Sequence, residues 1–501
     1  MNIRVEPVLI SFIFLTLIQV SVNCQKSQTC CEKYCYEFDN VRPQEEFFSS
    51  KTSYFIGKHA DLGKDFHVPN CTPIKIWLYI RHGSRLPKTR EMKRLSQLEE
   101  LRDEIIANYE ERNSQPVIGA MCKNDIDLLK TWRWDSNITS EYNEYLTVQG
   151  WNEAKILAHR YRKHFPNIFQ DNYDESKFIF RYTDVHRTEA SFKAFTEGLF
   201  GENASDYILT PPMEENKKMM MPYKFCPTDK EETAGENSEY GKYLKSEIMK
   251  QLVSDVSQRL GFKKPLELRQ VMDMYDMCIY DQSFNMSESS PWCTAFTPSQ
   301  IYDLEYPEDL RKYYESGHGR EANARFLCEL MNDMLGHLGN NEQPKAVVFL
   351  SHSSSYLLLL SSLGAFKDSE PLLADNYHRL ADRKWRLSKI ARLASNFAAV
   401  KYYCPNEVEK RKVKFFINEE PLELEGCDGG MCDWNVVKDR YKIYSEVDCD
   451  EYYCTKSKTP TGAAAGSGTT TESAANVPSS YIFLFVTALV TLVATSFNAI
   501  F

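Results

Sequence analysis

The sequence predicts an α/β fold, with a mostly parallel sheet covered by helices on both faces and a mainly helical cap insertion. Short segments that are apolar throughout, such as 76–80 and 346–350, are typical of strands buried on both faces of a sheet. Between them, segments such as 151–165 carry apolar residues at helical spacing, which indicates crossover helices. No repeat of fixed period is visible, so a solenoid or a propeller is not expected.

The order of the elements follows from these periodicities and from the glycines and prolines at segment ends. The stretch 202–345 breaks the alternation and is predicted to be the cap; within it, residues 217–229 have no clear pattern and can be interpreted as a loop. In chain order we predict a strand at 76–80, a helix at 151–165 stopped by Pro166, a strand at 177–182, a helix at 188–200 ending near Gly201, a strand at 346–350, a helix at 356–363, and late strands at 398–403 and 413–417.

The charge distribution indicates a small anionic ligand. The chain of 501 residues has a formal net charge of -10, which argues against nucleic-acid binding. Residues 81–94 nevertheless contain six basic residues and one acid, Glu91. A basic pocket on an acidic protein suits a small polyanion, and Lys88 is a candidate substrate-binding residue. The alternative, a solvated helix face, fits Lys93 and Arg94 better.

The N-terminal region and the cysteines indicate the secretory pathway. Residues 1–24 are interpreted as a signal peptide, because Arg4 precedes an apolar run that ends in small or medium residues. Cleavage after Cys24 would leave fourteen of the fifteen cysteines, an even number that fits disulfides in an oxidising compartment. Metal ligation is the disfavoured alternative for two cysteine groups, which are Cys30, Cys31 and Cys35, and Cys427, Cys432, Cys449 and Cys454.

Glycosylation and anchoring signals point the same way. Four N-x-S/T sequons are candidate glycosylation sites, at Asn70, Asn137, Asn203 and Asn285. Residues 456–480 form a linker of small polar residues, and 481–501 are apolar without a Lys or Arg behind them. This pattern resembles a glycosylphosphatidylinositol (GPI) signal, and an ordinary membrane helix is the alternative. The attachment candidates are Gly466, Ser467 and Ser473.

These signals predict where the folded domain lies in the chain and in the cell. We expect an α/β core built from 25–201 and 346–455. It is predicted to be held by a lipid anchor on the outer face of the plasma membrane, with secretion or residence in the ER lumen as alternatives.

A charged heptad follows the first predicted strand, and it is suited to handling phosphate. It reads Arg81-His82-Gly83-Ser84-Arg85-Leu86-Pro87. Guanidinium groups bind phosphate oxygens bidentately, and an imidazole between them can attack phosphorus once its other nitrogen is hydrogen-bonded. We expect the glycine at position 83 to allow a phosphoryl group to approach the backbone closely.

Two further strand ends deliver polar residues. Arg187 follows the strand 177–182, and His352 follows the strand 346–350. Because ligands of parallel sheets bind beyond the carboxyl ends of the strands, these side chains are expected to meet the heptad. His186 is interpreted as a structural or surface residue instead.

The heptad resembles the R-H-G-x-R-x-P signature of the histidine acid phosphatase family. The related phosphoglycerate mutase branch also begins with R-H-G, but the second arginine and the proline favour the acid phosphatases. Weaker stretches, at 290–293, 371–377 and 394–396, are similar to the multiple inositol polyphosphate phosphatase branch.

The resemblance implies the histidine phosphatase fold and a phosphomonoesterase that needs no metal or cofactor. It implies that His82 is the nucleophile, which forms a phosphohistidine, and that His352 is a second active-site residue. The residues that it implies bind phosphate are Arg81, Arg85, Arg187 and His352. The implied substrates are inositol polyphosphates such as inositol hexakisphosphate.

The sequence departs from the family at the position of the proton donor. The resemblance places an acid just after the second histidine, as His-Asp or His-Ala-Glu, but this chain has Ser354 where the branch has glutamate. Asp184 or Asp368 could supply the acid instead. We therefore predict weakened turnover with phosphate-ligand binding retained, and a higher catalytic rate in Ser354→Glu.

Two other functions remain open at this point. A catalytically inactive protein that binds phosphorylated ligands is one alternative, because the expected acid is missing. A general acid phosphatase for small phosphomonoesters is the other, because it differs only in the shape of its pocket.

Overall fold

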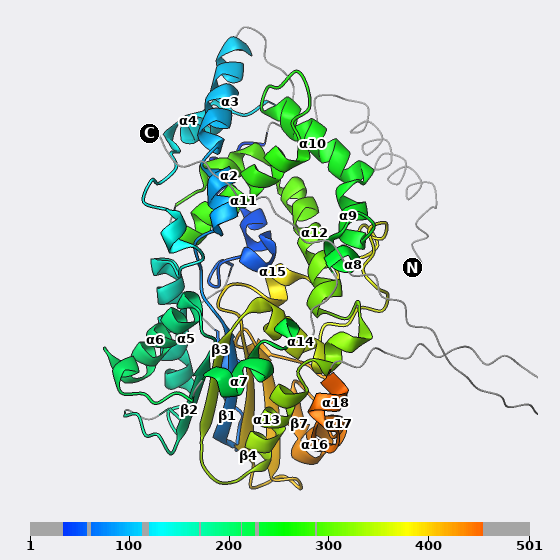
Figure 1. Cartoon of the computed structure of the whole chain (residues 1–501). Coiled ribbons are helices and arrows are strands. Elements are labelled where there is room, and N and C mark those ends of the chain that lie inside the picture. The colour runs from blue at the N-terminus through cyan, green and yellow to red at the C-terminus, as the bar shows by residue number, and fades with distance from the viewer. Residues whose placement is uncertain are drawn as a thin grey trace, which may run out of the picture. The chain divides into compact units, whose positions relative to one another are not determined.

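A computed structural model describes residues 34–57, 62–112, 120–169, 172–211, 213–225, 230–285 and 288–453. These residues form one mixed sheet flanked by helices, with a further group of helices beyond one end of the strands (Figure 1). This arrangement confirms the predicted α/β class. The predicted signal peptide, linker, GPI attachment region and apolar tail lie outside the described residues.

The sheet has seven strands, and its central path runs in the order β2-β3-β1-β4-β5-β6, with β7 paired to β5. The strands are β1 (Thr72–Arg81), β2 (Phe178–Tyr182), β3 (Ala346–Ser351), β4 (Asn396–Tyr403), β5 (Arg411–Ile417), β6 (Glu420–Pro421) and β7 (Met431–Asp433).

Helices fill the connections between the strands. The α-helices are α2 (Thr89–Leu95), α3 (Leu98–Arg112), α4 (Lys123–Thr131), α5 (Val148–His164), α6 (His186–Phe200), α7 (Met213–Met220), α8 (Lys230–Ala234), α9 (Glu239–Leu244), α10 (Glu247–Arg259), α11 (Leu268–Phe284), α12 (Pro298–Ser316), α13 (Cys328–Gly339), α14 (Ser353–Ser362), α15 (Leu387–Ile390), α16 (Trp434–Arg440), α17 (Ile443–Glu446) and α18 (Cys449–Tyr453). The 3-10 turns are η1 (Pro43–Phe47), η2 (Ser49–Lys51), η3 (Lys64–Phe66), η4 (Ser140–Tyr142), η5 (Ala204–Asp206), η6 (Pro222–Lys224), η7 (Pro291–Ala295) and η8 (Glu321–Arg325).

The sheet is parallel in one half and antiparallel in the other. Strands β2, β3 and β1 are parallel neighbours, whereas β4 pairs antiparallel with β1 and β5 antiparallel with β4. The parallel half matches the expectation, but the antiparallel direction of the late strands was not predicted. For β5 the physical reason is its short connection to β4, because a few residues can only turn the chain back on itself. The parallel register aligns Ile80 and Tyr182 with Leu350, so the three strands end together.

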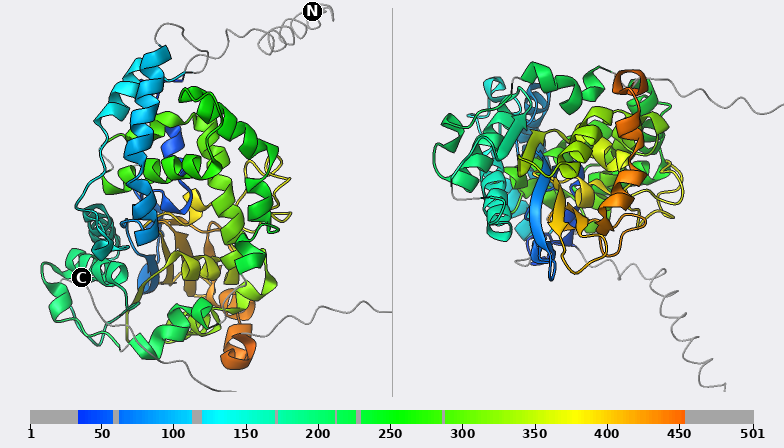
Figure 2. Two further views of the ribbon diagram at one scale, coloured as in Figure 1. Left: turned by 45° about the horizontal axis from the view of Figure 1, so that its top comes forward. Right: turned by 90° about the horizontal axis from the view of Figure 1, so that it is seen from below.

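Each face of the sheet is buried by its own set of helices. On one face, Leu78, Phe180 and Val348 pack in a core with side chains of α5 and α6. On the other face, Trp77 and Phe349 pack with α13 and α14. The two views in Figure 2 show these layers on the two sides of the strands. Burial on both faces is the reason that segments 76–80 of β1 and 346–350 of β3 are apolar throughout.

Most predicted elements are confirmed, with shifts of a few residues at their ends. Helix α5 begins earlier than predicted because the Thr147 hydroxyl caps it by accepting from the Gly150 N–H. It ends at His164, just before Pro166, as expected. The interpretation of 217–229 as a loop is wrong for its first residues, which complete α7. Among them Met220 is buried and Met219 is partly buried, and this tertiary packing outweighs an ambiguous local pattern.

The helices α9–α12, here called the cap, lie beyond the strand ends (Figure 1). They belong to the predicted insertion, but α2, which comes directly after the heptad, also packs against α11. The part of the chain that the structure describes contains no helix long and apolar enough to cross a membrane.

Disulfides close the fold at several points. The described cysteines pair as Cys35–Cys122, Cys71–Cys404, Cys278–Cys293, Cys328–Cys449 and Cys427–Cys432. Cys30, Cys31 and Cys454 lie outside the described residues. Such a framework is typical of proteins that fold in an oxidising compartment.

Candidate active site

A cavity of about 470 Å³ lies between the strand ends and the cap. Three segments that are far apart in the sequence converge there, since β1, β3 and α6 each place polar residues at this edge. Its lining contains all the residues predicted to attack or bind phosphate, together with the candidate Lys88; these are Arg81, His82, Arg85, Lys88, Arg187 and His352.

His82 is buried at the floor of the cavity, with 4% of its surface exposed. Its Nδ1 lies 2.9 Å from the carbonyl oxygen of Gly83. Because a carbonyl can only accept, Nδ1 carries the hydrogen and Nε2 keeps its lone pair. Burial, and then the positive charges of Arg81 and Arg187, lower the pKa of His82 well below its ordinary value. The ring is therefore neutral and suited to nucleophilic attack through Nε2.

His352 faces His82 across the cavity, with ring centroids 5.7 Å apart. Its Nδ1 is 3.3 Å from an Nη of Arg187, and its Nε2 is 2.8 Å from the Thr183 hydroxyl. A guanidinium can only donate, so Nδ1 accepts and Nε2 donates to Thr183. Burial and the neighbouring Arg187 lower the pKa of His352, which is therefore neutral as well.

The arginines form a cationic arc around the two histidines. Arg81 donates to the backbone carbonyls of Ser50 and, at 2.7 Å, of Ala391, and burial lowers its pKa to about 9. Among the described residues, the Nε atoms of Arg81 and Arg187 are buried without a hydrogen-bond partner. Buried donors of this kind are suited to anionic oxygens.

One acid lies within the arc. The carboxylate of Glu144 is 3.7 Å from Arg85 and 3.6 Å from Arg187, so it bridges the two guanidinium groups. Glu144 has a positive φ of 57°, which a non-glycine residue adopts only where its surroundings hold it. No motif or periodicity in the sequence indicates that Glu144 lies between these two arginines.

The expected role of Gly83 needs correction. A Cβ at Gly83 would lie 2.3 Å from the carbonyl oxygen of Gly150, and a Cβ at Gly150 would lie 2.1 Å from the carbonyl oxygen of Ser84. Glycine is therefore required for close packing of the heptad against α5, and the space beside its Cα belongs to α5 and not to a ligand. Glu153 of the same helix accepts the Ser84 N–H at 2.7 Å and its hydroxyl at 3.0 Å.

The other candidates lie farther from the histidines. Lys88 is exposed at the cavity rim. His186 stacks on Tyr145, with ring centroids 3.6 Å apart, and is not among the lining residues, which supports the interpretation as a surface residue. Asp184 is exposed, and Asp368 accepts the backbone N–H groups of 384 and 385; neither of these two possible acids lines the cavity.

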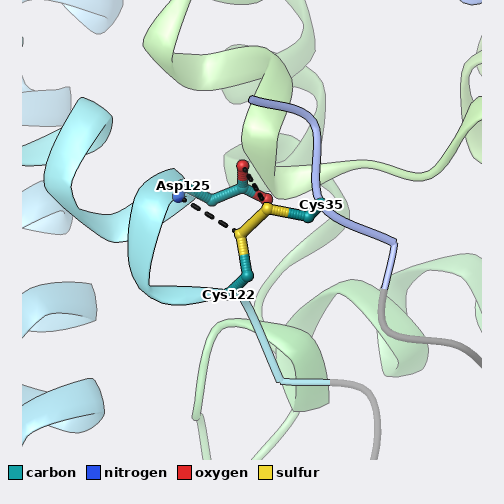
Figure 3. A group of neighbouring side chains, drawn as sticks. All are labelled: Cys35, Cys122 and Asp125. Atoms are coloured by element: carbon teal, nitrogen blue, oxygen red, sulfur yellow. Dashed lines mark hydrogen bonds between the residues drawn. A yellow bond between two sulfur atoms is a disulfide. The ribbon is translucent and has the colours of Figure 1, made fainter. Parts of the chain in front are cut away.

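The four predicted glycosylation sites are accessible. Each sequon asparagine is exposed, and these are Asn70, Asn137, Asn203 and Asn285. Among the candidate cysteine groups, Cys35 is bonded to Cys122, next to Asp125 (Figure 3). A disulfide sulfur is not a thiolate, and Asp125 accepts the backbone N–H groups of 36 and 37, so this cluster does not suit a metal ion.

Some site residues could not be found from the sequence. Thr183 orients His352, Glu153 holds the heptad, and Glu144 and Lys312 line the cavity. A buried glutamate within the apolar pattern of 151–165 is the one signal that could have indicated Glu153. The other three carry no local pattern.

Comparison with known proteins agrees with this geometry. The profile of the histidine phosphatase superfamily (branch 2) matches residues 76–418, which include both histidines and all the arginines of the arc. The chain belongs to this superfamily. It is therefore a histidine-type phosphomonoesterase in its fold and in the set of residues that line its cavity.

Two relatives are similar to the chain over most of their length. The chain is 41% identical over 438 residues, covering 87% of its length and 93% of the relative, to multiple inositol polyphosphate phosphatase 1 of Drosophila melanogaster. It is 28% identical over 398 residues, covering 74% of its length and 79% of the relative, to the protein of the same name from Homo sapiens.

Solved structures share the fold. The phytase from D. castellii superposes with a TM-score of 0.63 and 18% identity, covering 82% of this chain and 89% of that one. The multiple inositol polyphosphate phosphatase of Bifidobacterium longum in complex with inositol hexasulfate superposes with a TM-score of 0.55 and 14% identity, covering 78% and 97%.

Proposed function

We propose that this member of the histidine phosphatase superfamily removes phosphate from inositol polyphosphates through a phosphohistidine on His82. The observation that carries the proposal is the neutral imidazole of His82, whose Nε2 lone pair lies inside an arc of arginines. The names of the relatives support the substrate class. The basic rim residue Lys88 suits a substrate with several phosphates.

The reaction has two steps. The Nε2 atom of His82 attacks phosphorus and the ester oxygen leaves, while Arg81, Arg187 and His352 offset the charge on the phosphoryl oxygens. Water then attacks the phosphohistidine and releases phosphate. Binding of a phosphate dianion favours a protonated His352, because the anion opposes the effects of burial and of Arg187 that lower its pKa.

The test is phosphate release from inositol hexakisphosphate by purified protein. His82→Ala is expected to lose activity by about 10⁴-fold or more, as other enzymes do without their nucleophile. His378→Ala changes an exposed histidine away from the cavity and serves as the control. A phosphoenzyme that is stable in base, labile in acid and absent from His82→Ala would support the intermediate. Equal rates in the wild type and His82→Ala would contradict the proposal.

A second candidate function is binding of phosphorylated ligands without turnover. Ser354 at the expected acid position is the observation that favours it. Calorimetric binding of inositol hexakisphosphate without phosphate release would identify this function. A general acid phosphatase would instead turn over simple phosphomonoesters with a kcat/KM at least as high as that for inositol polyphosphates.

The proposed location is the secretory pathway, with a GPI anchor at the cell surface. The disulfides and the exposed sequon asparagines support passage through an oxidising compartment. The small-residue linker and apolar segment support the anchor. Release from intact cells by phosphatidylinositol-specific phospholipase C tests it, and retention after treatment would favour a membrane helix.

A further inference from the structure

An alkyl phosphate cannot be cleaved quickly unless the leaving oxygen receives a proton, so the cavity needs a proton donor near His82 and His352. Position 354 cannot supply it, because a serine hydroxyl does not ionise near neutral pH. The structure shows which group lies beside that position. The ammonium of Lys312, on α12 of the cap, donates to the Ser354 hydroxyl at 3.0 Å and to Glu315 at 3.1 Å.

The geometry points to Lys312 as the proton donor for the leaving oxygen, a role that rests on the proposed hydrolysis. Lys312 lines the same cavity as His82, and 6% of its surface is exposed. An ammonium carries three donors, and the contacts to Ser354 and Glu315 use two of them. The third can reach a substrate oxygen, while the two contacts fix the direction of the side chain.

The protons balance over the two steps. As the His82 nitrogen forms its bond to phosphorus, the bond from phosphorus to the ester oxygen breaks, and Lys312 protonates that oxygen to give the free alcohol. The neutral amine then accepts a proton from the water that attacks the phosphohistidine. The second step releases phosphate and returns His82 to its neutral form, and Lys312 is again an ammonium for the next turnover.

Three carboxyl groups that line the cavity, two on α12 of the cap and one on α2, are poor proton donors. Burial opposes their ionisation, but Lys312 and Arg311 lower the pKa of Glu315, and Arg311 lowers that of Glu308. Despite its burial, Glu91 has its pKa lowered to about 2 by Lys51. Glu91, Glu308 and Glu315 are therefore ionised near neutral pH and have no proton to donate.

Lys312 has the opposite tendency. Burial lowers its pKa below the ordinary value for lysine, although Glu315 and Glu308 oppose the shift and Arg311 adds to it. Ser354, from α14, is its uncharged neighbour. A cationic acid with a lowered pKa is a better proton donor than an ordinary lysine.

The experiment compares two substrates with different leaving groups. Glycerol 3-phosphate releases an alkoxide that needs a proton, whereas p-nitrophenyl phosphate releases a stable phenolate that does not. Lys312→Met is expected to lower kcat for glycerol 3-phosphate by about 100-fold or more and kcat for p-nitrophenyl phosphate by less than about tenfold. Lys312→Arg keeps the charge but cannot release a proton, so it should be nearly as slow on the alkyl substrate.

The pH profile gives a second readout. With glycerol 3-phosphate, the wild-type kcat should fall as the pH rises through the pKa of Lys312, and this limb should be missing in Lys312→Arg. The double variant Lys312→Met with Ser354→Glu returns a carboxyl donor at position 354 and should recover at least about tenfold near pH 5. Glu144→Gln removes the acid between the arginines and should leave the ratio of the two substrates as in the wild type.

Two results would overturn the role of Lys312. One is wild-type turnover of glycerol 3-phosphate by Lys312→Arg, which would show that only the positive charge matters. The other is an equal loss on both substrates in Lys312→Met with an unchanged melting temperature, which would show a positioning role. If the wild type cleaves neither substrate, the proposed hydrolysis itself fails, which is a distinct outcome.

Discussion

The cations on the two sides of the cavity have different partners. On the side of the strand ends, Arg81 binds backbone carbonyls, and the two histidines are neutral because they are buried beside cations. On the side of the cap, the cations have carboxylate partners. Arg311 pairs with Glu308 and Glu315, and Lys312 pairs with Glu315.

This difference separates binding from proton transfer. Cations that face few carboxylates retain most of their attraction for a phosphate dianion. On the cap side the carboxylates offset the charge of the cations, and it is burial that lowers the pKa of Lys312 and so favours release of its proton. We expect substitutions on the strand side to affect every phosphomonoester, and those on the cap side to depend on the substrate.

Among the substitutions that test this comparison, Arg187→Gln on the strand side is expected to have the largest effect. It removes a proposed donor to the phosphoryl group and the contact to Nδ1 of His352, so kcat should fall by about 10²- to 10³-fold. The loss should be the same for p-nitrophenyl phosphate and for inositol hexakisphosphate. Lys193→Gln, on the exposed face of the same helix, is the control. A loss limited to one substrate would contradict the division between the two sides.

Gly150→Ala tests whether the heptad depends on its packing against α5. The new Cβ would meet the Ser84 backbone, so the loop must shift; we expect about 1–3 kcal/mol lower stability and a drop in kcat approaching about 10²-fold. Gly336→Ala in α13 meets no atom within 4 Å and is the matched control. Chemical unfolding and steady-state kinetics measure both effects, and full activity in Gly150→Ala would show that the loop position is not critical.

The two sides should also titrate in different pH ranges. The pKa values of His82 and His352 are lowered in the folded protein. Below a pH of about 6.5 the unfolded chain therefore binds more protons than the folded protein. The free energy of unfolding should fall as the pH drops below this value, by about 1 kcal/mol per pH unit for each histidine. Glu308 and Glu315 also have lowered pKa values, so their contribution is lost only below pH of about 4.5.

The measurement is urea unfolding between pH 4 and 8. The double variant His82→Gln with His352→Gln should reduce the change between pH 5 and 6.5, to which His337 also contributes, and leave the change below 4.5. An unaltered slope between pH 5 and 6.5 would show that the two histidines are not neutral in the folded protein.

The smallest effect is expected at the rim. Lys88→Gln should raise KM for inositol hexakisphosphate by about two- to fivefold, since an exposed ionic contact contributes about 0.2–1 kcal/mol. It should not change the kinetics with glycerol 3-phosphate. Lys93→Gln, which is exposed but does not line the cavity, is the control. Equal effects of the two substitutions would indicate only long-range attraction.

Much of the strand side could be predicted because its information is local. The residue types of the heptad indicate phosphate chemistry by themselves. The segments 76–80 and 346–350 are apolar because both faces of the sheet are covered. The rule for parallel strands then placed Arg187 and His352 beside His82. The direction of β4 and β5 could not be obtained in this way, because periodicity shows that a strand exists but not how it pairs.

The sequence alone determined the α/β class, the heptad, and the departure at Ser354. Only the tertiary structure decided that Gly83 meets Gly150, that Glu144 lies between two arginines, and that Lys312 lies beside Ser354. The physical reason is the range of each interaction. Motifs and periodicity act over a few residues, whereas these contacts join residues about forty or more positions apart and leave no pattern in one chain.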